Sequence, residues 1–183
     1  LVVNPKTLTV SGAVAQNKVY DGNNTATFTG ATLVGVVGSD AVTLTSAGTF
    51  NTINVATGIA ITPNFSISGA QSGNYTLTQP SGLSANITQA SQTITFGPLT
   101  AVSYGGANFN LTGTASSGLT VSYTSSNTSV ATVSGNTVTI VGVGSTTITA
   151  SQAGNTNVAP ATNVTQTLTV NQASQTITFA ALP

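Results

Sequence analysis

The stretch QASQTITF, residues 89–96, organises this 183-residue sequence, because it recurs without change at residues 172–179. The two copies are offset by 83 residues, 172 minus 89. An exact repeat at a fixed offset indicates tandem modules, and this offset is long enough for one small β-domain. We therefore expect residues 89–171 to form one complete module and residues 172–183 to be the first strand of the next.

The repeated stretch also shows the residue pattern from which the fold class follows. Thr93 and Thr95 alternate with Ile94 and Phe96, so one side of an extended chain is apolar and the other carries hydroxyls. Further runs with this alternation are Lys6–Val10, Leu119–Tyr123, Thr137–Val141, Thr146–Ala150 and Thr165–Val170. No segment sustains the period of an amphipathic helix, and strands buried on one side have this period of two. The sequence predicts an all-β protein.

Turn residues separate these runs at short intervals. Ser134-Gly135-Asn136 lies between two apolar runs and predicts a tight hairpin. About seven short strands joined by such turns are typical of an immunoglobulin-like sandwich. We predict two tandem immunoglobulin-like β-sandwich modules, residues 5–88 and residues 89–171, with residues 1–4 as the end of a preceding module.

The alternation also predicts the core of the module at residues 89–171. One apolar face per strand is enough to build a two-layer core. The expected core residues are Ile94, Phe96, Phe109, Leu111, Val121, Tyr123, Val133, Val138, Ile140, Ile148, Leu168 and Val170.

The module at residues 5–88 follows the same plan with a diverged sequence. Three landmarks occur in the same order in both modules: Tyr20-Asp21-Gly22 with Tyr104-Gly105-Gly106, Phe28-Thr29-Gly30 with Leu111-Thr112-Gly113, and Gln71–Asn74 with Gln152–Asn155. Their offsets drift slightly, as small loop insertions would produce. The junction at residues 86–90 is too short for a flexible tether, so we expect limited bending between modules.

Charge is almost absent from the sequence. Hydrophobic residues make up 39% and charged residues 2%, and the charged residues are Lys6, Lys18, Asp21 and Asp40. Disordered chains combine low hydrophobicity with high net charge, so folded domains are expected. A basic nucleic-acid footprint and a polybasic membrane patch are both missing. The longest apolar runs, such as Ile140–Val143, fall far short of the roughly 20 residues of a membrane helix, so neither nucleic acid nor membrane insertion is expected.

Two sets of motifs resemble bacterial repeat families. Residues 18–22, KVYDG, followed by Ala26-Thr27-Phe28, resemble the YDG domain of bacterial surface proteins. The second module is similar to bacterial immunoglobulin-like repeats of the group 2 and MBG kinds. Its motifs are Tyr104-Gly105-Gly106, Ser117-Gly118-Leu119, Tyr123–Asn127 (YTSSN), Val130–Val133 (VATV) and Ile148–Asn155 (ITASQAGN). The resemblance implies stalk or adhesive modules of large secreted proteins, with no shared catalytic residues.

Residues that carry catalysis or bind metals are missing. The sequence has no His and no Cys, so a hydrolase triad, a thiolate nucleophile and a zinc site lack their side chains. Asp21 and Asp40 are the two carboxylates, and each is expected to serve a turn. No acidic residue lies near residues 86–90, where calcium would stiffen an array. We expect no enzyme activity, no catalytic or metal site and no cofactor.

An isopeptide bond is a covalent alternative in the first module. Lys6 shares the strand parity of Leu8 and Val10, so its side chain would lean toward the core, as in surface-fibre domains that join Lys to Asn. The opposing interpretation is that Lys6 reaches solvent at the end of its strand. Asn86 has the opposite parity to its apolar neighbour Ile87, which argues against the bond.

Uncharged surface residues leave binding alternatives open. The Thr-x-Thr pairs resemble the spacing of ice-binding or crystalline-polysaccharide-binding surfaces, although Thr is also a favoured strand residue and sheets twist. The pairs are Thr7/Thr9, Thr43/Thr45, Thr93/Thr95, Thr137/Thr139 and Thr167/Thr169. Stacking against a carbohydrate would rest on Tyr20, Tyr75, Tyr104 and Tyr123.

The leading expectation for function is a structural spacer or adhesive repeat of a large extracellular protein on the bacterial cell surface. Its expected partners are neighbouring repeats of the same chain, further copies in lateral or end-to-end fibres, and a surface glycan. Neutral surfaces lack the like-charge repulsion that keeps ordinary proteins apart, which makes self-association physically easy. The alternative is a carbohydrate- or ice-binding surface module.

Overall fold

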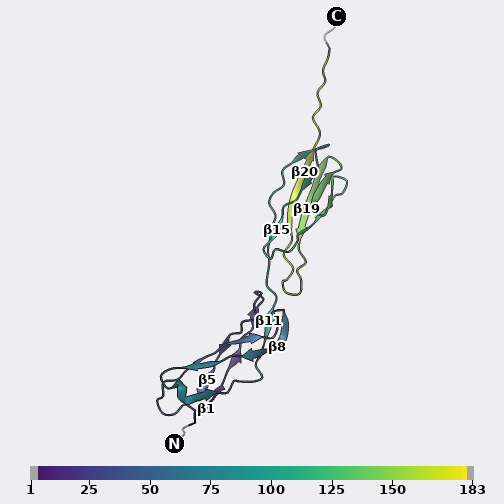
Figure 1. The fold of residues 1–183 in the computed structure, drawn as a ribbon. Helices are drawn as coiled ribbons and strands as arrows, with labels where there is room; N and C mark the ends of the chain where they lie inside the picture. Colours follow the sequence, from purple (N-terminus) through teal and green to yellow (C-terminus); the bar gives the residue numbers. More distant parts are fainter. Residues whose placement is uncertain (1–3, 181–183) are drawn as a thin grey trace. The chain divides into compact units, whose positions relative to one another are not determined.

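The structure is a computed structural model that describes residues 4–180. This part of the chain contains strands β1 to β20 and one 3-10 helix, Ser72–Asn74, and it has no α-helix. The all-β prediction is therefore confirmed. The chain divides into two compact units, residues 1–90 (unit 1) and residues 91–183 (unit 2), and Figure 1 shows the strands of each.

Unit 1 is built from eleven short strands in four sheets. They are β1 (Lys6–Ser11), β2 (Val14–Ala15), β3 (Lys18–Val19), β4 (Phe28–Thr29), β5 (Thr32–Val34), β6 (Thr43–Thr45), β7 (Gly48–Phe50), β8 (Ala56–Pro63), β9 (Ser66–Ser68), β10 (Tyr75–Leu77) and β11 (Ser84–Thr88). The largest sheet has the order β3-β11-β8-β7, a second has the order β10-β1-β5, and the pairs β2-β4 and β6-β9 complete the unit.

Unit 2 has nine strands in three sheets. They are β12 (Ile94–Thr95), β13 (Val102–Ser103), β14 (Phe109–Asn110), β15 (Thr114–Ala115), β16 (Ser122–Ser125), β17 (Ala131–Ser134), β18 (Thr137–Ile140), β19 (Gly144–Ser151) and β20 (Val164–Asn171). The sheet orders are β13-β20-β19-β16, β14-β18-β17 and β12-β15. The alternation in sequence set these strands, since each run of apolar and hydroxyl residues has one face to bury.

In each unit, an early strand pairs in parallel with the last strand. In unit 1, β3 pairs in parallel with β11; in unit 2, β13 pairs in parallel with β20. The backbone N–H of Tyr20 donates to the carbonyl of Thr88 (2.8 Å), and that of Tyr104 donates to the carbonyl of Asn171 (2.9 Å). The tyrosines of the first sequence landmark therefore have the same backbone role in both units.

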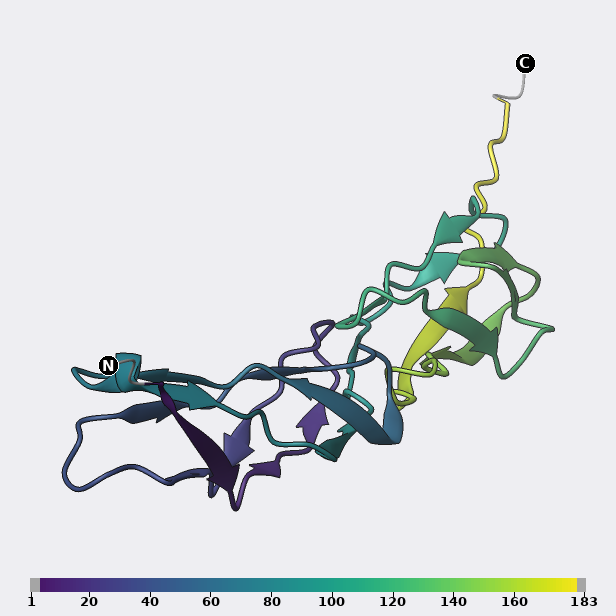
Figure 2. The ribbon, with the colours of Figure 1, turned by 60° about the horizontal axis from the view of Figure 1, so that its bottom comes forward.

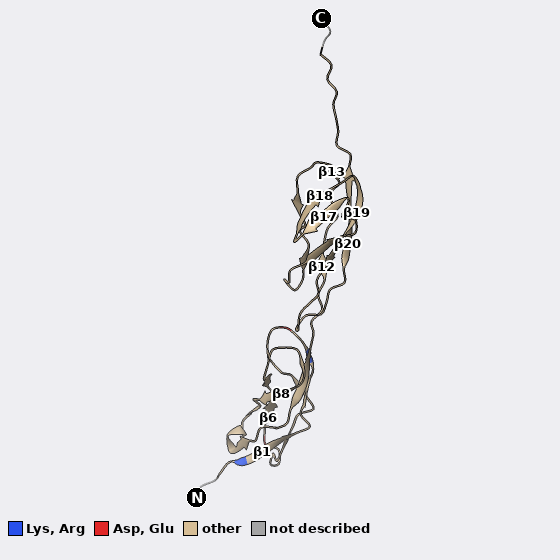
Figure 3. Ribbon diagram, turned by 90° about the vertical axis from the view of Figure 1, so that its right-hand side faces the viewer, with Lys and Arg blue, Asp and Glu red and all other residues tan. Residues whose placement is uncertain are grey.

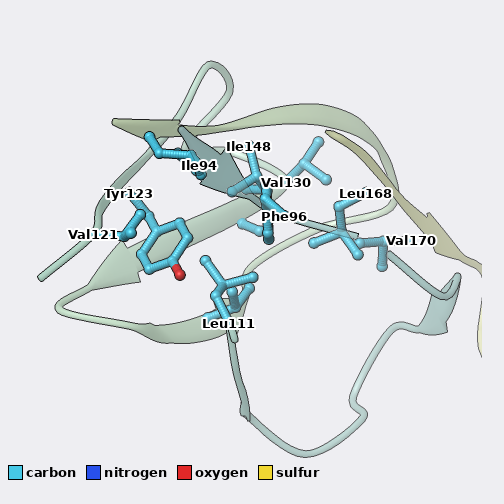
Figure 4. Packing of buried hydrophobic residues seen from close by; sticks show 12 residues of the cluster. Ile94, Phe96, Leu111, Val121, Tyr123, Val130, Ile148, Leu168 and Val170 are labelled. Atoms are coloured by element: carbon cyan, nitrogen blue, oxygen red, sulfur yellow. The ribbon is translucent and has the colours of Figure 1, made fainter. Parts of the chain in front are cut away.

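The core of unit 2 lies between its sheets and draws apolar side chains from β12, β16, β18, β19 and β20 (Figure 4). Nine of the twelve expected core residues are buried, and Phe109, Val133 and Ile140 are partly buried. The buried cluster also includes Val130, Ala131 and Ala150. Because side chains of different sheets meet in one cluster, unit 2 has the layered packing of a β-sandwich.

The hairpin predicted at Ser134-Gly135-Asn136 forms as a two-residue turn. Ser134 pairs with Thr137, and β17 and β18 run antiparallel from there. Gly135 has φ +60°, a conformation that a type II′ turn requires at its first central position and that other residues adopt with strain.

Unit 1 has a smaller core. Its buried cluster comprises Ala26, Phe50, Ile59, Ile61, Ala85 and Ile87. Phe65 packs edge-on against Phe28 with ring centroids 4.8 Å apart, a favoured aromatic geometry. Leu8, at 0% exposure, anchors β1 within this unit.

Residues 172–183 are predicted to be the first strand of a next module, and the structure describes them as far as residue 180. Residues 172–180 have no secondary structure and are exposed, and they run out of unit 2 as an extended yellow segment in Figure 1 and Figure 2. An isolated segment cannot form strand hydrogen bonds, because these need a neighbouring strand. The predicted module end at residues 1–4 lies, apart from Asn4, outside the described residues.

We predict that Leu168→Ala destabilises unit 2 by about 2–5 kcal/mol, because the Leu168 side chain is fully buried and its removal leaves a cavity. Thr167→Ala, one residue away on the exposed face of β20, is the matched control and should cost less than about 1 kcal/mol. Thermal unfolding followed by calorimetry measures both. Equal losses in the two variants would contradict the assigned inward and outward faces.

Candidate functional site

The outer face of the four-stranded sheet in unit 2 is lined by hydroxyl side chains. Along β19, Ile148 and Ala150 point into the core and are fully buried. Their neighbours Thr147 and Thr149 must therefore point outward, since successive side chains of a strand lie on opposite faces. The same alternation in β20 buries Leu168 and turns the threonines on either side of it outward.

Strand register brings these hydroxyl residues side by side. Thr149 lies opposite Thr124 on β16 and opposite Thr165 on β20, and Thr147 lies opposite Thr167. The resulting hydroxyl face comprises Ser122, Thr124, Ser126, Ser145, Thr147, Thr149, Ser151, Thr165, Thr167 and Thr169. Neighbouring strands stand roughly 4.8 Å apart and alternate residues about 6.8 Å apart along a strand, so the face is a two-dimensional array.

The chemistry of the hydroxyl face is neutral hydrogen bonding. The Ser122 and Ser151 hydroxyls lie 3.1 Å apart, and the N–H of Thr147 donates to the Ser126 oxygen (3.0 Å). No residue after Asp40 carries a formal charge, and Figure 3 accordingly shows no charged residue in unit 2. Each hydroxyl both donates and accepts, so the face suits water, sugar hydroxyls or another hydroxyl face.

Only part of this face is predictable from the sequence. Thr167/Thr169 belongs to it, whereas Thr137/Thr139 lies on β18 in a different sheet. The pairs Thr7/Thr9 and Thr43/Thr45 lie in unit 1. Within unit 2, the predicted pairs Thr137/Thr139 and Thr167/Thr169 therefore lie in different sheets. The runs around β19 and β20 were visible as strands, but only their register reveals that Thr147, Thr149 and Thr165 are neighbours.

The two carboxylates are not brought together. Asp21 forms an ion pair with Lys18 (2.7 Å) and accepts hydrogen bonds from the backbone and side chain of Asn23. Asp40 instead accepts the hydroxyl of Tyr75 at 2.5 Å. Acid–base catalysis by a carboxylate pair requires both groups near one substrate, and these two have separate structural partners.

Asp21 holds the turn that follows β3. Lys18 Nζ also donates to the side-chain oxygen of Asn23 (2.8 Å) and to its carbonyl (3.1 Å). The hydrogen bond from Lys18, together with the backbone N–H of Asn23, holds the pKa of Asp21 below its ordinary value of 3.8. The Lys18, Asp21 and Asn23 cluster thus fixes the backbone of the Tyr-Asp-Gly turn.

Asp40 and Tyr75 connect a loop to β10. Tyr75 is buried, and its hydroxyl accepts the N–H of Val37 (3.1 Å) while donating to Asp40. The hydrogen bond to the Asp40 carboxylate raises the pKa of Tyr75 above 10.0, because it stabilises the protonated phenol. This pair explains why an acidic residue stands at the end of the turn at residues 38–39.

The remaining candidate side chains are placed apart. Lys6 is exposed at the start of β1, in a different sheet from Asn86 on β11, whose side-chain oxygen accepts the N–H of Gly58. Lys6 thus reaches solvent, as the opposing interpretation expected. Of the tyrosines, Tyr75 and Tyr123 are buried, and Tyr104 is 50% exposed. Two of the four tyrosines expected to stack against a carbohydrate, Tyr75 and Tyr123, are therefore buried.

Within residues 4–180, no group of three or more His, Cys, Asp or Glu could hold a metal ion. No helix in this range is long and apolar enough to cross a membrane.

We predict that unit 1 loses stability in acid through Asp21. Its pKa is lowered in the folded state, so the stabilisation is present above pH 3.8 and is lost as the pH falls through the folded-state value. Asp21→Asn should lower the melting temperature of unit 1 at neutral pH and flatten its acid dependence. Unit 2, which has no Asp, Glu, Lys, Arg or His side chain, is the internal control, and an equal acid loss in both units would contradict this role.

Unit 1 matches a known protein family. The family model described as YDG domain matches residues 4–82, a range that begins just before β1 and ends just before β11. No curated protein matches the chain. The sequence resemblance on residues 18–22 is therefore supported by an independent family match, and unit 1 is similar to the YDG domain.

Proposed function

We propose that the chain is a pair of structural spacer modules from a large extracellular protein or fibre of the bacterial cell surface, working without catalysis. Unit 1 is its YDG module, and unit 2 is proposed to be a bacterial immunoglobulin-like repeat of the group 2 or MBG kind. The family match of residues 4–82 and the repeated eight residues at 89–96 and 172–179 support a tandem array.

The observation that carries this proposal is the parallel pairing of early and last strands. When a chain is pulled from its two ends, two parallel strands near those ends are drawn in opposite directions along their length. All hydrogen bonds between them are then loaded together instead of one after another. Unit 2 has this arrangement in β13 and β20. Unit 1 has it in β3 with β11, and its first strand, β1, also pairs in parallel with the penultimate strand, β10.

This arrangement suits a module that transmits tension. In unit 2 the shear-loaded bonds include the N–H of Tyr104 to the carbonyl of Asn171. In unit 1 they include the N–H of Thr78 to the carbonyl of Leu8 (2.9 Å) and the N–H of Tyr20 to the carbonyl of Thr88. A spacer that projects an adhesive tip must resist pulling, whereas an enzyme has no such requirement.

We predict that Tyr104→Pro lowers the force at which unit 2 unfolds, because proline has no N–H to donate to Asn171. Tyr104→Ala is the matched control: it keeps the N–H and removes only the half-exposed ring. Single-molecule force spectroscopy of the chain, with unit 1 as the internal reference, measures both. Equal unfolding forces for the two variants would remove the mechanical role of this pairing.

A second candidate function is favoured by the hydroxyl face of unit 2, namely binding of a carbohydrate or of ice. Its neutral, regularly spaced hydroxyls match the chemistry of such surfaces, while sheet twist works against a planar ice contact. Because the face is lined by hydroxyl side chains, hydrogen bonding is the proposed mode of recognition.

Under this second function, the chain cosediments with a crystalline polysaccharide or shows thermal hysteresis, and Thr149→Lys with Thr167→Lys abolishes either effect. Both positions point outward, so the lysines stay solvated and the fold is kept. Thr139→Lys on β18 is the control outside the face. If the wild-type chain shows neither activity, the second function is excluded and the spacer function remains.

A further inference from the structure

The four-stranded sheet of unit 2 has an open edge at β16. This strand ends the order β13-β20-β19-β16, and among the described residues no further strand pairs with it. The backbone N–H of Ser126 donates to the carbonyl of Thr147 (3.0 Å), and Ser122, four residues earlier, faces β19 in the same register. Backbone groups of an antiparallel strand point alternately to either side. Those of Val121 and Tyr123 therefore point away from β19.

In unit 1 the same position of the sheet is occupied. The order β3-β11-β8-β7 again runs from an early strand through the last strand, so β7 stands where unit 2 has β16. Residues 24–26 lie along the outer edge of β7. The N–H of Ala26 donates to the carbonyl of Gly48 (2.9 Å), the N–H of Phe50 donates to the carbonyl of Asn24 (2.7 Å), and the contact is antiparallel. An antiparallel segment at this edge is thus compatible with the fold.

Unit 2 uses the corresponding segment elsewhere. The offset of 84 residues between Tyr20 and Tyr104, 104 minus 20, makes residues 108–110 equivalent to residues 24–26. These residues include β14, which pairs with β18 in another sheet. The edge of β16 has therefore lost the segment that covers β7 in unit 1. Because β16 lies between β15 and β17 in the sequence, this open edge is a property of unit 2 itself.

The space beside β16 has room for another strand. A cavity of about 800 Å³ is lined by residues 121–123, by the apolar side chains of Leu111 and Leu119, and by the turn residue Gly135. An added strand would stand roughly 4.8 Å from β16. The open edge is thus accessible to an extended chain.

The open edge also lacks the features that normally keep strand edges apart. Natural sheets protect their edges with charged side chains, prolines or bulges. Residues 119–127 contain neither a charged residue nor a proline. The pairing of β16 with β19 runs through four residue pairs without a bulge. The outward side chains of Ser122 and Thr124 carry only hydroxyls, so charge does not oppose pairing with an identical edge.

We propose that unit 2 of a second copy of this chain pairs through the open edge, with β16 antiparallel to the partner's β16 about a two-fold axis at Ser122. Val121 then exchanges backbone hydrogen bonds with the partner's Tyr123, and Tyr123 does so with the partner's Val121. A second copy fits because antiparallel pairing about this axis makes the edge self-complementary, as an isologous interface requires. The hydroxyl faces of both copies join into one continuous array.

This inference names the surface for lateral association of the proposed spacer, and it rests on that function. A single contact contains few hydrogen bonds, so two free chains pair weakly. Modules repeated along two aligned chains add contacts at a high effective concentration, which strengthens the association. A chain that does not pair through β16 would remove this surface. The tension-bearing strand pairs, which are tested by force spectroscopy, would be unaffected.

The first test uses disulfide trapping in the full chain, which has no native cysteine. Ser122→Cys places two thiols opposite each other at a non-hydrogen-bonded position, where Cα atoms lie about 4.5 Å apart, within the range of a disulfide. Thr149→Cys on β19 lies on the same face, one strand away from the edge, and is the matched control. Under mild oxidation Ser122→Cys should form a covalent dimer and Thr149→Cys should not. No dimer of Ser122→Cys, or equal dimer in both variants, overturns the proposal.

The second test measures reversible association by sedimentation velocity. The dimer fraction of the unmodified chain should rise with concentration. Ser122→Lys should stay monomeric, because like charges then face each other across the axis. Thr149→Lys adds the same charge to the same face and should associate as the unmodified chain does. Calorimetry checks that unit 2 stays folded in both variants. Equal association of the two lysine variants, or an unmodified chain that is monomeric up to its solubility limit, contradicts pairing through β16.

Discussion

The pairing of the last strand with an early strand is the interaction on which each unit depends. In unit 2, β20 hydrogen-bonds to β19 on one side and to β13 on the other, and Leu168 and Val170 from the same strand are buried in the core. β20 therefore joins the last part of unit 2 to an early part, β13, and holds together the sheet that presents the hydroxyl face. Unit 1 repeats this arrangement with β11 between β3 and β8.

A chain almost without charge must satisfy its buried polar groups in another way. Unit 2 uses amides and hydroxyls. Thr146 is 3% exposed and its oxygen lies 2.7 Å from the Ser125 hydroxyl and accepts the N–H of Asn127. Gln92 has the same role near β12. Such neutral bonds avoid the desolvation cost of buried ions, and their strength does not change with salt as that of exposed ion pairs does. The fold of unit 2 should therefore be largely indifferent to ionic strength.

Features of the fold that depend on local alternation could be predicted from the sequence. Features that depend on contacts between strands distant in the sequence could not. The core of unit 2 followed from local alternation, which is why Ile148 and Leu168 were predicted correctly. Val130 and Ala131 were missed because they stand beside a turn, where no alternation marks the inward face. The hydroxyl face was predicted only in part, for another reason. It depends on the register between β19 and β20, and a shift of one residue would turn Thr147 and Thr149 into the core.

The two copies of QASQTITF have the same sequence but different structures. Both have the alternation of a strand, yet only residues 89–96 contain one, β12 at Ile94–Thr95, which pairs with β15. The Gln152 and Ser117 side chains add hydrogen bonds to Gln92 just before it. The stability of this strand thus depends on the residues of unit 2 that receive it as much as on its own sequence. In both units the last strand runs directly into this sequence, after Thr88 and after Asn171. Each last strand therefore delivers, at its own end, a segment with the side chains that a module of the unit 2 kind needs to complete its core.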